Sequence, residues 1–130
     1  MQLDAHNKYR ADHGVPPLEY DPVCQKAAQA WADNMVKKKK MYHASKKENP
    51  NMGENLAMYS SSDPNDKTLS QTPHATEGWY DEIKDYDFNN QGFSMECGHF
   101  TQVVWKESTK VGFGIAGTYV VARYLPHGNM

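Results

Sequence analysis

Cysteine is scarce in this sequence, whose 130 residues include only Cys24 and Cys97. Two cysteines allow at most one disulfide, far fewer than the frameworks that stabilise small secreted domains. The sequence also lacks any Asn-x-Ser/Thr acceptor for N-glycosylation. Both absences favour reduced thiols and an intracellular setting, with a secreted or extracellular protein as the alternative.

Long apolar runs are absent as well. No stretch approaches the roughly 18 apolar residues that cross a bilayer, and the opening MQLD does not resemble a signal peptide. Residue 2 is Gln2 rather than glycine, so the sequence as given has no myristoylation acceptor. Whether native tails precede residue 1 or follow residue 130 stays open.

An excess of positive charge is missing too, because the formal net charge is -2. This balance argues against a nucleic-acid partner. Basic residues are nevertheless concentrated, since six of the fourteen Lys and Arg lie within residues 37–47. We expect this segment to contact anionic lipid or a membrane surface; the alternative is a solvated helix end favoured by the helix dipole. The candidate docking residues are Lys37, Lys38, Lys39 and Lys40.

The residues that are present indicate one globular domain of mixed structure. Helices are predicted over residues 3–10, from Asp21-Pro22 to the lysines at 37–40, and over about 76–85. A short strand is predicted over 54–59, and residues 111–117 and 118–124 form a predicted hairpin. Because strands and helices do not alternate regularly, we predict a small antiparallel sheet covered by helices.

The most informative segment is 97–105, with the sequence CGHFTQVVW. It predicts a tight turn that leads into a short apolar helix, with His99 at its exposed end. The segment closely resembles the signature of the CAP superfamily, which comprises cysteine-rich secretory, antigen 5 and pathogenesis-related proteins. Three further segments resemble family motifs in the same order: HNKYR at 6–10, GENL at 53–56, and residues 120–130.

The resemblance implies an α+β fold, a three-layer α-β-α sandwich with a small, mostly antiparallel sheet, over residues 1–130 as a single domain. Segments 13–18, 79–84 and 120–124 are most similar to the Golgi-associated pathogenesis-related branch of the family, which is intracellular and membrane-associated. The usual disulfide set of secreted members is absent, because Ala122 stands where many of them have a cysteine.

The resemblance also implies a cleft that gathers two histidines and two glutamates: His43, Glu54, Glu82 and His99. Imidazoles and carboxylates are groups that Zn²⁺ and other divalent ions bind. We therefore predict that His43 and His99 bind an exchangeable divalent metal such as Zn²⁺, each oriented by a carboxylate. The alternative is a structural hydrogen-bonded cluster that holds no metal.

Other residue types that could belong to a site receive structural interpretations. We predict that His6, Asn7 and Arg10 tie the first helix to the domain through hydrogen bonds and ion pairs. Cys24 is predicted to be a buried apolar residue. The remaining predictions place two histidines on the surface and three tryptophans in the core: His13, His74, Trp31, Trp79 and Trp105.

The favoured function is a non-enzymatic binding domain that associates with membrane lipid or protein partners. A sterol or fatty acid and a second copy of the chain are further candidate partners. One alternative is a metal- or serine-dependent hydrolase or protease that uses His43, Glu82 and His99. Against it, Ser94 in the segment GFSME fails the GxSxG pattern, and no HExxH occurs. The other alternative is a secreted defence or venom-type CAP protein.

Overall fold

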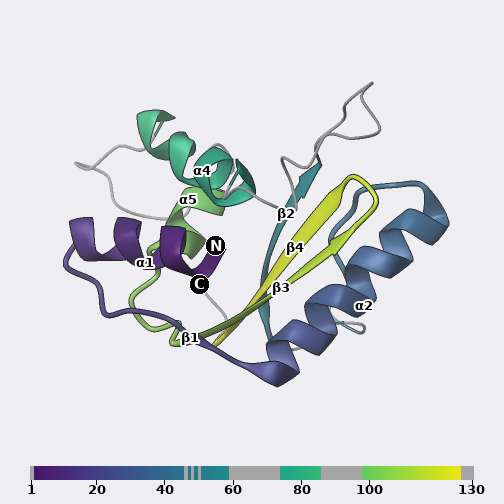
Figure 1. The fold of residues 1–130 in the computed structure, drawn as a ribbon, viewed down its shortest axis with the longest axis horizontal. Helices are drawn as coiled ribbons and strands as arrows, with labels where there is room; N and C mark the ends of the chain where they lie inside the picture. Colours follow the sequence, from purple (N-terminus) through teal and green to yellow (C-terminus); the bar gives the residue numbers. More distant parts are fainter. Residues whose placement is uncertain are drawn as a thin grey trace.

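The computed structural model describes residues 2–45, 47, 49, 51–58, 74–85 and 98–126. A four-stranded sheet lies between one long helix on one face and a group of shorter helices on the other (Figure 1). The elements in chain order are α1 (Gln2–Asp12), β1 (Glu19–Tyr20), α2 (Pro22–Lys38), β2 (Gly53–Met58), α4 (His74–Asp81), the 3-10 helix η1 (Glu82–Asp85), α5 (Gly98–Val103), β3 (Lys110–Ala116) and β4 (Tyr119–Leu125). The predicted three-layer α-β-α sandwich is confirmed.

The sheet has the strand order β1-β3-β4-β2, so β2 lies at an edge. β4 pairs antiparallel with both β3 and β2, whereas the short β1 runs parallel to β3. The prediction of a small, mostly antiparallel sheet with a C-terminal hairpin is therefore confirmed. β1 was not predicted, because a two-residue strand has no periodicity from which to infer it.

α2 covers one face of the sheet and begins as the sequence predicts. Asp21 caps the helix by accepting a hydrogen bond from the Cys24 amide at 3.1 Å, and Pro22 occupies the first turn. The helix ends at Lys38, and the next residue, Lys39, caps it with a left-handed backbone at a φ of 55°. Its buried stripe consists of Cys24, Ala28, Trp31, Ala32 and Met35.

Two glycines of β3 let the backbone of α2 approach the sheet closely. A Cβ atom placed on Gly112 would lie 2.0 Å from the backbone nitrogen of Gln25. A Cβ on Gly114 would lie 2.5 Å from the Cα of Gln29. The helix and the strand can therefore pack this closely only because both positions lack a side chain.

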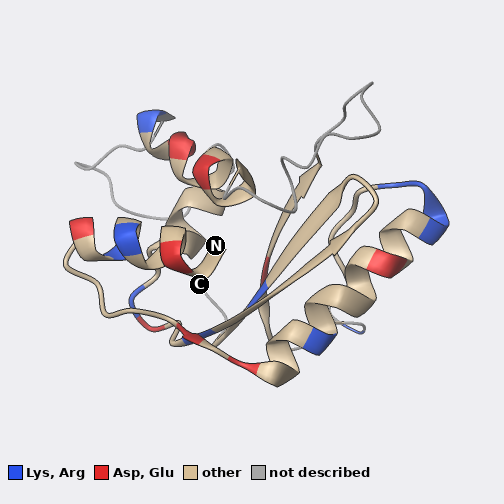
Figure 2. Ribbon diagram, viewed as in Figure 1, with Lys and Arg blue, Asp and Glu red and all other residues tan. Residues whose placement is uncertain are grey.

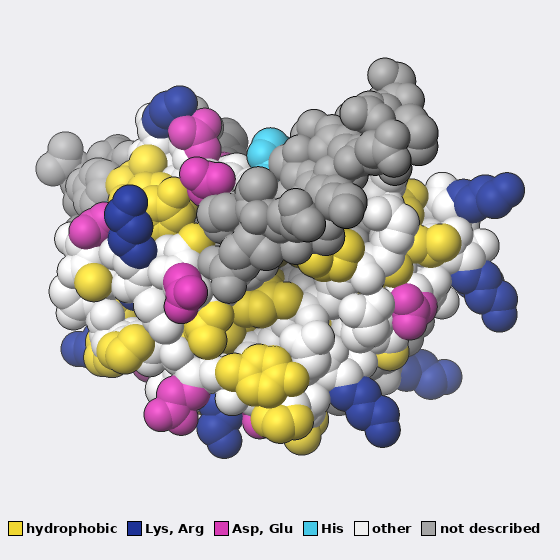
Figure 3. All heavy atoms as spheres, in the orientation of Figure 1, with side chains coloured by type: hydrophobic (Ala, Val, Ile, Leu, Met, Phe, Trp, Pro, Cys, Tyr) yellow, Lys and Arg dark blue, Asp and Glu magenta, His cyan; other side chains and the backbone are white. Residues whose placement is uncertain are grey.

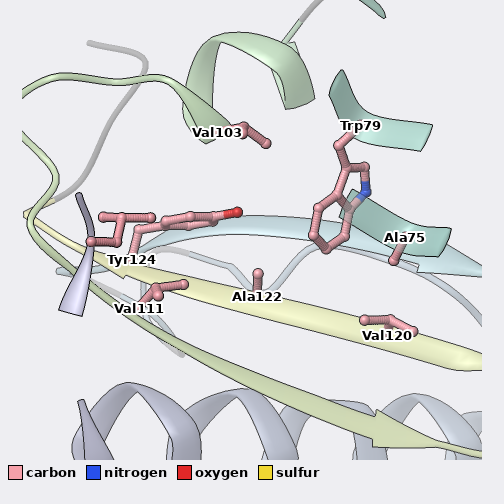
Figure 4. Close-up of a cluster of buried hydrophobic side chains, with 8 residues drawn as sticks. Ala75, Trp79, Val103, Val111, Val120, Ala122 and Tyr124 are labelled. Atoms are coloured by element: carbon pink, nitrogen blue, oxygen red, sulfur yellow. The ribbon is translucent and has the colours of Figure 1, made fainter. Parts of the chain in front are cut away.

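The opposite face of the sheet carries the larger apolar cluster, drawn in Figure 4. Trp79 of α4 is 3% exposed, and its indole nitrogen donates to the carbonyl of Leu56 at 2.8 Å. The indole therefore fills the space between α4 and the sheet without leaving a polar group unpaired. The other buried members of the cluster are Leu18, Ala75, Val103, Val111, Val120, Ala122 and Tyr124.

α1 is tied to the domain by the polar side chains that the sequence analysis singled out. Asn7 donates to the carbonyl of Leu18 at 3.2 Å and accepts from its amide at 2.7 Å. The buried guanidinium of Arg10 donates to four carbonyls, those of Pro16, Val103, Trp105 and Ser108. The prediction that these residues tie α1 to the domain by hydrogen bonds is confirmed. The prediction also expected ion pairs, but among the described residues Arg10 contacts carbonyls rather than carboxylates. Burial lowers the pKa of Arg10 to about 10.

Several local predictions require adjustment. The helix predicted over 76–85 begins earlier, at His74, and its last turn tightens into η1, as helix ends often do. His13 is half-buried rather than on the surface, because its Nε2 lies 2.9 Å from the hydroxyl of Tyr80. Trp105 is also only half-buried.

The prediction for Cys24 is confirmed. Cys24 is a free, fully buried thiol, as predicted, and burial raises its pKa to about 12. A thiol with so high a pKa is a poor nucleophile. Cys97 and Ser94 lie outside the described residues.

Candidate metal-binding site

The first candidate pair joins His43, in the segment after α2, to Glu54 of β2. The segment is held in place because the indole nitrogen of Trp31 donates to the carbonyl of Tyr42 at 2.9 Å. Oε1 of Glu54 then accepts hydrogen bonds from Nδ1 of His43 at 2.7 Å and from the amide of Ala44 at 3.1 Å. A carboxylate can only accept, so Nδ1 is the protonated ring nitrogen, and in the neutral ring Nε2 keeps its lone pair.

Glu54 is itself held by Arg123, which lies opposite it on β4. Nη2 of Arg123 is 2.7 Å from Oε2 of Glu54, and both side chains are nearly buried. This distance is that of an ion pair, but the two groups are not aligned as in a hydrogen bond. Nε of Arg123 is also buried, and it has no hydrogen-bond partner in the described structure. The guanidinium also lies over the ring of Trp31, at 5.9 Å from its centre. The pair therefore depends mainly on charge attraction at low exposure.

The second candidate pair joins His99, at the start of α5, to Glu82 of η1. Oε2 of Glu82 lies 2.6 Å from Nδ1 of His99, while Oε1 accepts from the amides of His99 at 2.9 Å and Phe100 at 3.2 Å. The ring of Trp79 stacks beside the imidazole, with 6.3 Å between the ring centres. Glu82 thus fixes both the ring and the backbone of His99.

The edge strand β2 contacts both pairs through neighbouring residues. Its consecutive residues Glu54 and Asn55 point to opposite faces of the sheet, as strand geometry requires. Glu54 lies with Arg123 on the α2 side, whereas Asn55 donates to the carbonyl of His99 at 3.2 Å on the other side. Within the ranges described above, no group of three or more His, Cys, Asp or Glu side chains is placed to hold a metal ion. The structure thus shows the four predicted residues as two carboxylate–imidazole pairs.

The donor chemistry of both pairs fits metal-binding histidines. In each pair a carboxylate holds Nδ1, and the described residues offer no hydrogen-bond partner to either Nε2. A histidine that binds a metal usually has this arrangement, with its second nitrogen bonded to a carboxylate. His43 is 60% exposed and His99 is 35% exposed, so both rings can be reached from solvent.

Two residues of this site were missed by the analysis of the sequence. Arg123 interrupts the apolar run VVARY of β4, and a charge inside such a strand indicates a buried ion pair. Asn55 directly follows Glu54 in the GENL segment. Nothing in the sequence separates its role from that of its neighbours, because the bond to His99 spans 44 positions.

The candidate docking lysines are placed as predicted, at the end of α2. Lys37, Lys38, Lys39 and Lys40 are all exposed. Figure 2 shows this end of α2 in blue, and Figure 3 shows basic side chains that project from that side of the molecule. Val36, which is 40% exposed, and Met41, which is 43% exposed, flank the lysines with apolar surface.

An open pocket of about 400 Å³ is lined by Asn51, Thr109, Lys110, Leu125 and Pro126, and none of the four candidate metal-site residues lines it. In the described part of the chain, no helix is both long and apolar enough to span a bilayer.

The family model described as "Cysteine-rich secretory protein family" (CAP) matches residues 3–123. The chain belongs to this family. A human family member, Golgi-associated plant pathogenesis-related protein 1, is 38% identical over 133 residues, which cover 98% of this chain and 82% of the relative. Secreted protein RBT4 of Candida albicans is 38% identical over 136 residues, covering 98% of this chain but only 34% of that protein. The relatives of this CAP chain therefore include Golgi-associated and secreted proteins.

Solved structures support the same assignment. The crystal structure of NaASP2 with Zn²⁺ matches with a TM-score of 0.78 and 25% sequence identity, covering 99% of this chain and 79% of that chain. The CAP fold predicted from the four motifs is thereby confirmed.

Proposed function

We propose that this CAP domain is a non-catalytic binding domain that takes a divalent metal ion such as Zn²⁺ through His43 and His99. The observation that supports this most strongly is the pair of carboxylate–imidazole contacts, at 2.7 Å for His43 and 2.6 Å for His99. Each contact selects the tautomer that leaves Nε2 available as a ligand. The related NaASP2 structure, described as containing Zn²⁺, gives the proposal a precedent within the fold.

The histidines and the glutamates of the site have different roles in this proposal. His43 and His99 supply imidazole nitrogens, and Glu54 and Glu82 hold the rings and compensate positive charge. When bound, the ion supplies a Lewis acid with positions open to water or to a partner. Because only a neutral imidazole can bind a metal ion, metal affinity should be weaker in acid.

Thermal unfolding of metal-free protein with added Zn²⁺ tests this function. Binding to the native state alone raises stability by about 2.7 kcal/mol when free Zn²⁺ reaches 100 times the Kd. A melting temperature that is unchanged by Zn²⁺ would contradict the proposal. Zinc-dependent ester or peptide hydrolysis that is lost in His99→Ala would instead support the hydrolase alternative.

The second proposed function is docking on an anionic membrane surface, and the end of α2 favours it. Four consecutive exposed lysines lie between the exposed apolar residues Val36 and Met41. Basic residues near an anionic leaflet contribute roughly 1 kcal/mol each, and apolar side chains add affinity when they enter the interface. This partner implies an intracellular, membrane-associated location, which belongs to the same proposal. The name of the human relative describes that protein as Golgi-associated.

Sedimentation with vesicles of neutral lipid, with and without phosphatidylserine, tests the docking surface. Reversal of Lys37, Lys38, Lys39 and Lys40 to glutamate should weaken binding to anionic vesicles at least a hundredfold. The matched control reverses four dispersed exposed lysines, Lys8, Lys26, Lys84 and Lys106, and so makes the same change in net charge. Equal losses in both variants would show that only net charge matters and would contradict a defined docking surface.

A further inference from the structure

A buried chain of hydrogen bonds connects α1 to the backbone of His99. At its first end, Nδ1 of His6 lies 3.0 Å from the carbonyl of Gln2. A carbonyl only accepts, so Nδ1 is protonated and Nε2 of the neutral ring is an acceptor. The hydroxyl of Tyr124, 2.6 Å away, therefore donates to Nε2 of His6.

The direction of this first bond determines the next two. Since the only proton of the Tyr124 hydroxyl points to His6, its oxygen is free to accept, and Nδ2 of Asn55 donates to it at 3.2 Å. The second proton of the same amide donates to the carbonyl of His99, also at 3.2 Å. The amide of Asn55 thus has one orientation that satisfies both neighbours, and the alternative orientation would place oxygen against oxygen.

The three side chains that form this hydrogen-bond network are buried in the protein interior. His6 and Tyr124 are 0% exposed, and Asn55 is 1% exposed. Buried polar groups at such low exposure are costly to leave unpaired, so the network favours a single arrangement. Burial also keeps His6 neutral by lowering its pKa to about 4.

The network meets the candidate metal site at one residue. Glu82 holds the ring and amide of His99 from the side of η1, whereas Asn55 holds its carbonyl from the sheet. The start of α5 is therefore clamped from two sides, and α5 is too short for its own hydrogen bonds to fix the histidine.

We propose that Asn55 is a positioning residue that fixes the first turn of α5, and with it His99, and that Tyr124 and His6 orient its amide. The predicted effect of Asn55 on Zn²⁺ affinity rests on the proposed metal-binding function. The predicted effect of Asn55 on the position of His99 does not, because it concerns metal-free protein. Loss of a residue that positions a metal ligand typically weakens metal binding 10- to 100-fold. Because Asn55 acts on the backbone of His99 and not on its ring, we expect about a tenfold loss.

The test compares Asn55→Leu with Asn7→Leu by Zn²⁺ calorimetry and by amide hydrogen exchange in metal-free protein. Asn7 is the matched control, because its amide also makes two hydrogen bonds but holds Leu18, away from His99. We expect both variants to be less stable, and only Asn55→Leu to bind Zn²⁺ about tenfold more weakly. Its His99 and Phe100 amides, which donate to Glu82, should also exchange at least tenfold faster than in Asn7→Leu.

Tyr124→Phe removes only the hydroxyl that orients Asn55, and it provides the test if Asn55→Leu does not fold. We expect Tyr124→Phe to weaken Zn²⁺ binding and to speed exchange of the His99 and Phe100 amides, each by less than Asn55→Leu does. Unchanged exchange at His99 and Phe100, or equal weakening of Zn²⁺ binding in Asn7→Leu, would overturn the proposal. If the wild-type protein binds no Zn²⁺, the metal function fails, and the exchange rates alone decide whether Asn55 positions His99.

Discussion

Nδ1 of His43 lies 2.7 Å from Oε1 of Glu54, although the histidine is 60% exposed and the glutamate only 6% exposed. The position of an exposed ring is therefore set by a carboxylate fixed within the sheet. That carboxylate in turn neutralises the nearly buried Arg123. Glu54 accordingly has two separable roles, one in orienting a ligand and one in compensating a buried charge.

The second role predicts a large loss of stability for Glu54→Gln. The variant keeps the shape of the side chain but leaves the Arg123 cation without its counter-charge, and breaking one partner of a buried pair costs about 3 kcal/mol or more. Urea unfolding measures the difference. The control Asp81→Asn breaks the exposed pair with Lys84, at 3.0 Å, and should cost less than about 1 kcal/mol. Equal costs for the two variants would show that Arg123 does not depend on Glu54.

Gly112→Ala should disrupt the packing of α2 on the sheet. The added Cβ would lie 2.0 Å from the backbone of Gln25, and a backbone cannot rotate away as a flexible side chain can. We expect a loss of about 3 kcal/mol in the free energy of unfolding. Gly78→Ala, in α4, is the control, because open space surrounds its Cβ and alanine favours a helix. A Gly112→Ala protein as stable as Gly78→Ala would contradict the close approach of α2 to β3.

Acid should destabilise the protein through His6. Burial lowers the pKa of His6 from its ordinary value of 6.5 to about 4, so the unfolded chain takes up the proton first as the pH falls. The stability that this group contributes is complete above about pH 6.5 and is lost between there and about pH 4, by about 3 kcal/mol in total.

Urea unfolding of wild-type protein and His6→Gln between pH 7 and pH 4 measures this loss. The variant should be less stable at pH 7, and its stability should depend less on pH than that of the wild type. His74→Gln, which replaces an exposed histidine, should follow the wild-type curve. If the His6→Gln curve runs parallel to that of the wild type over the whole range, His6 is not the group responsible.

Much of the fold could be predicted from local signals. Asp21-Pro22 marked the start of α2, and the apolar spacing that follows it predicted the buried stripe. The C-terminal hairpin followed from two β-rich runs around Gly117. In contrast, the two-residue β1 exists only because β3 offers it a partner, and no local pattern records a tertiary pairing of that kind.

The sequence named the four candidate residues of the site but could not show which residues they contact. Motif resemblance named His43, Glu54, Glu82 and His99, and the structure shows which carboxylate holds which ring. Arg123 and Asn55 act through contacts between distant positions of the chain, so their roles depend on strand register. Strand geometry also explains why Glu54 contacts His43 and Arg123 while Asn55 contacts His99, since one step along a strand reverses the direction of the side chain.

The central claim is that His43 and His99 bind a divalent metal, and isothermal titration of Zn²⁺ into metal-free protein tests it most directly. The comparison is with His43→Ala/His99→Ala and with the matched double variant His13→Ala/His74→Ala, which also removes two imidazoles. The account predicts saturable binding in the wild type and in the control, and loss of that binding in His43→Ala/His99→Ala. Binding that is the same in all three proteins, or absent from the wild type, would contradict the claim and leave the two pairs as structural contacts.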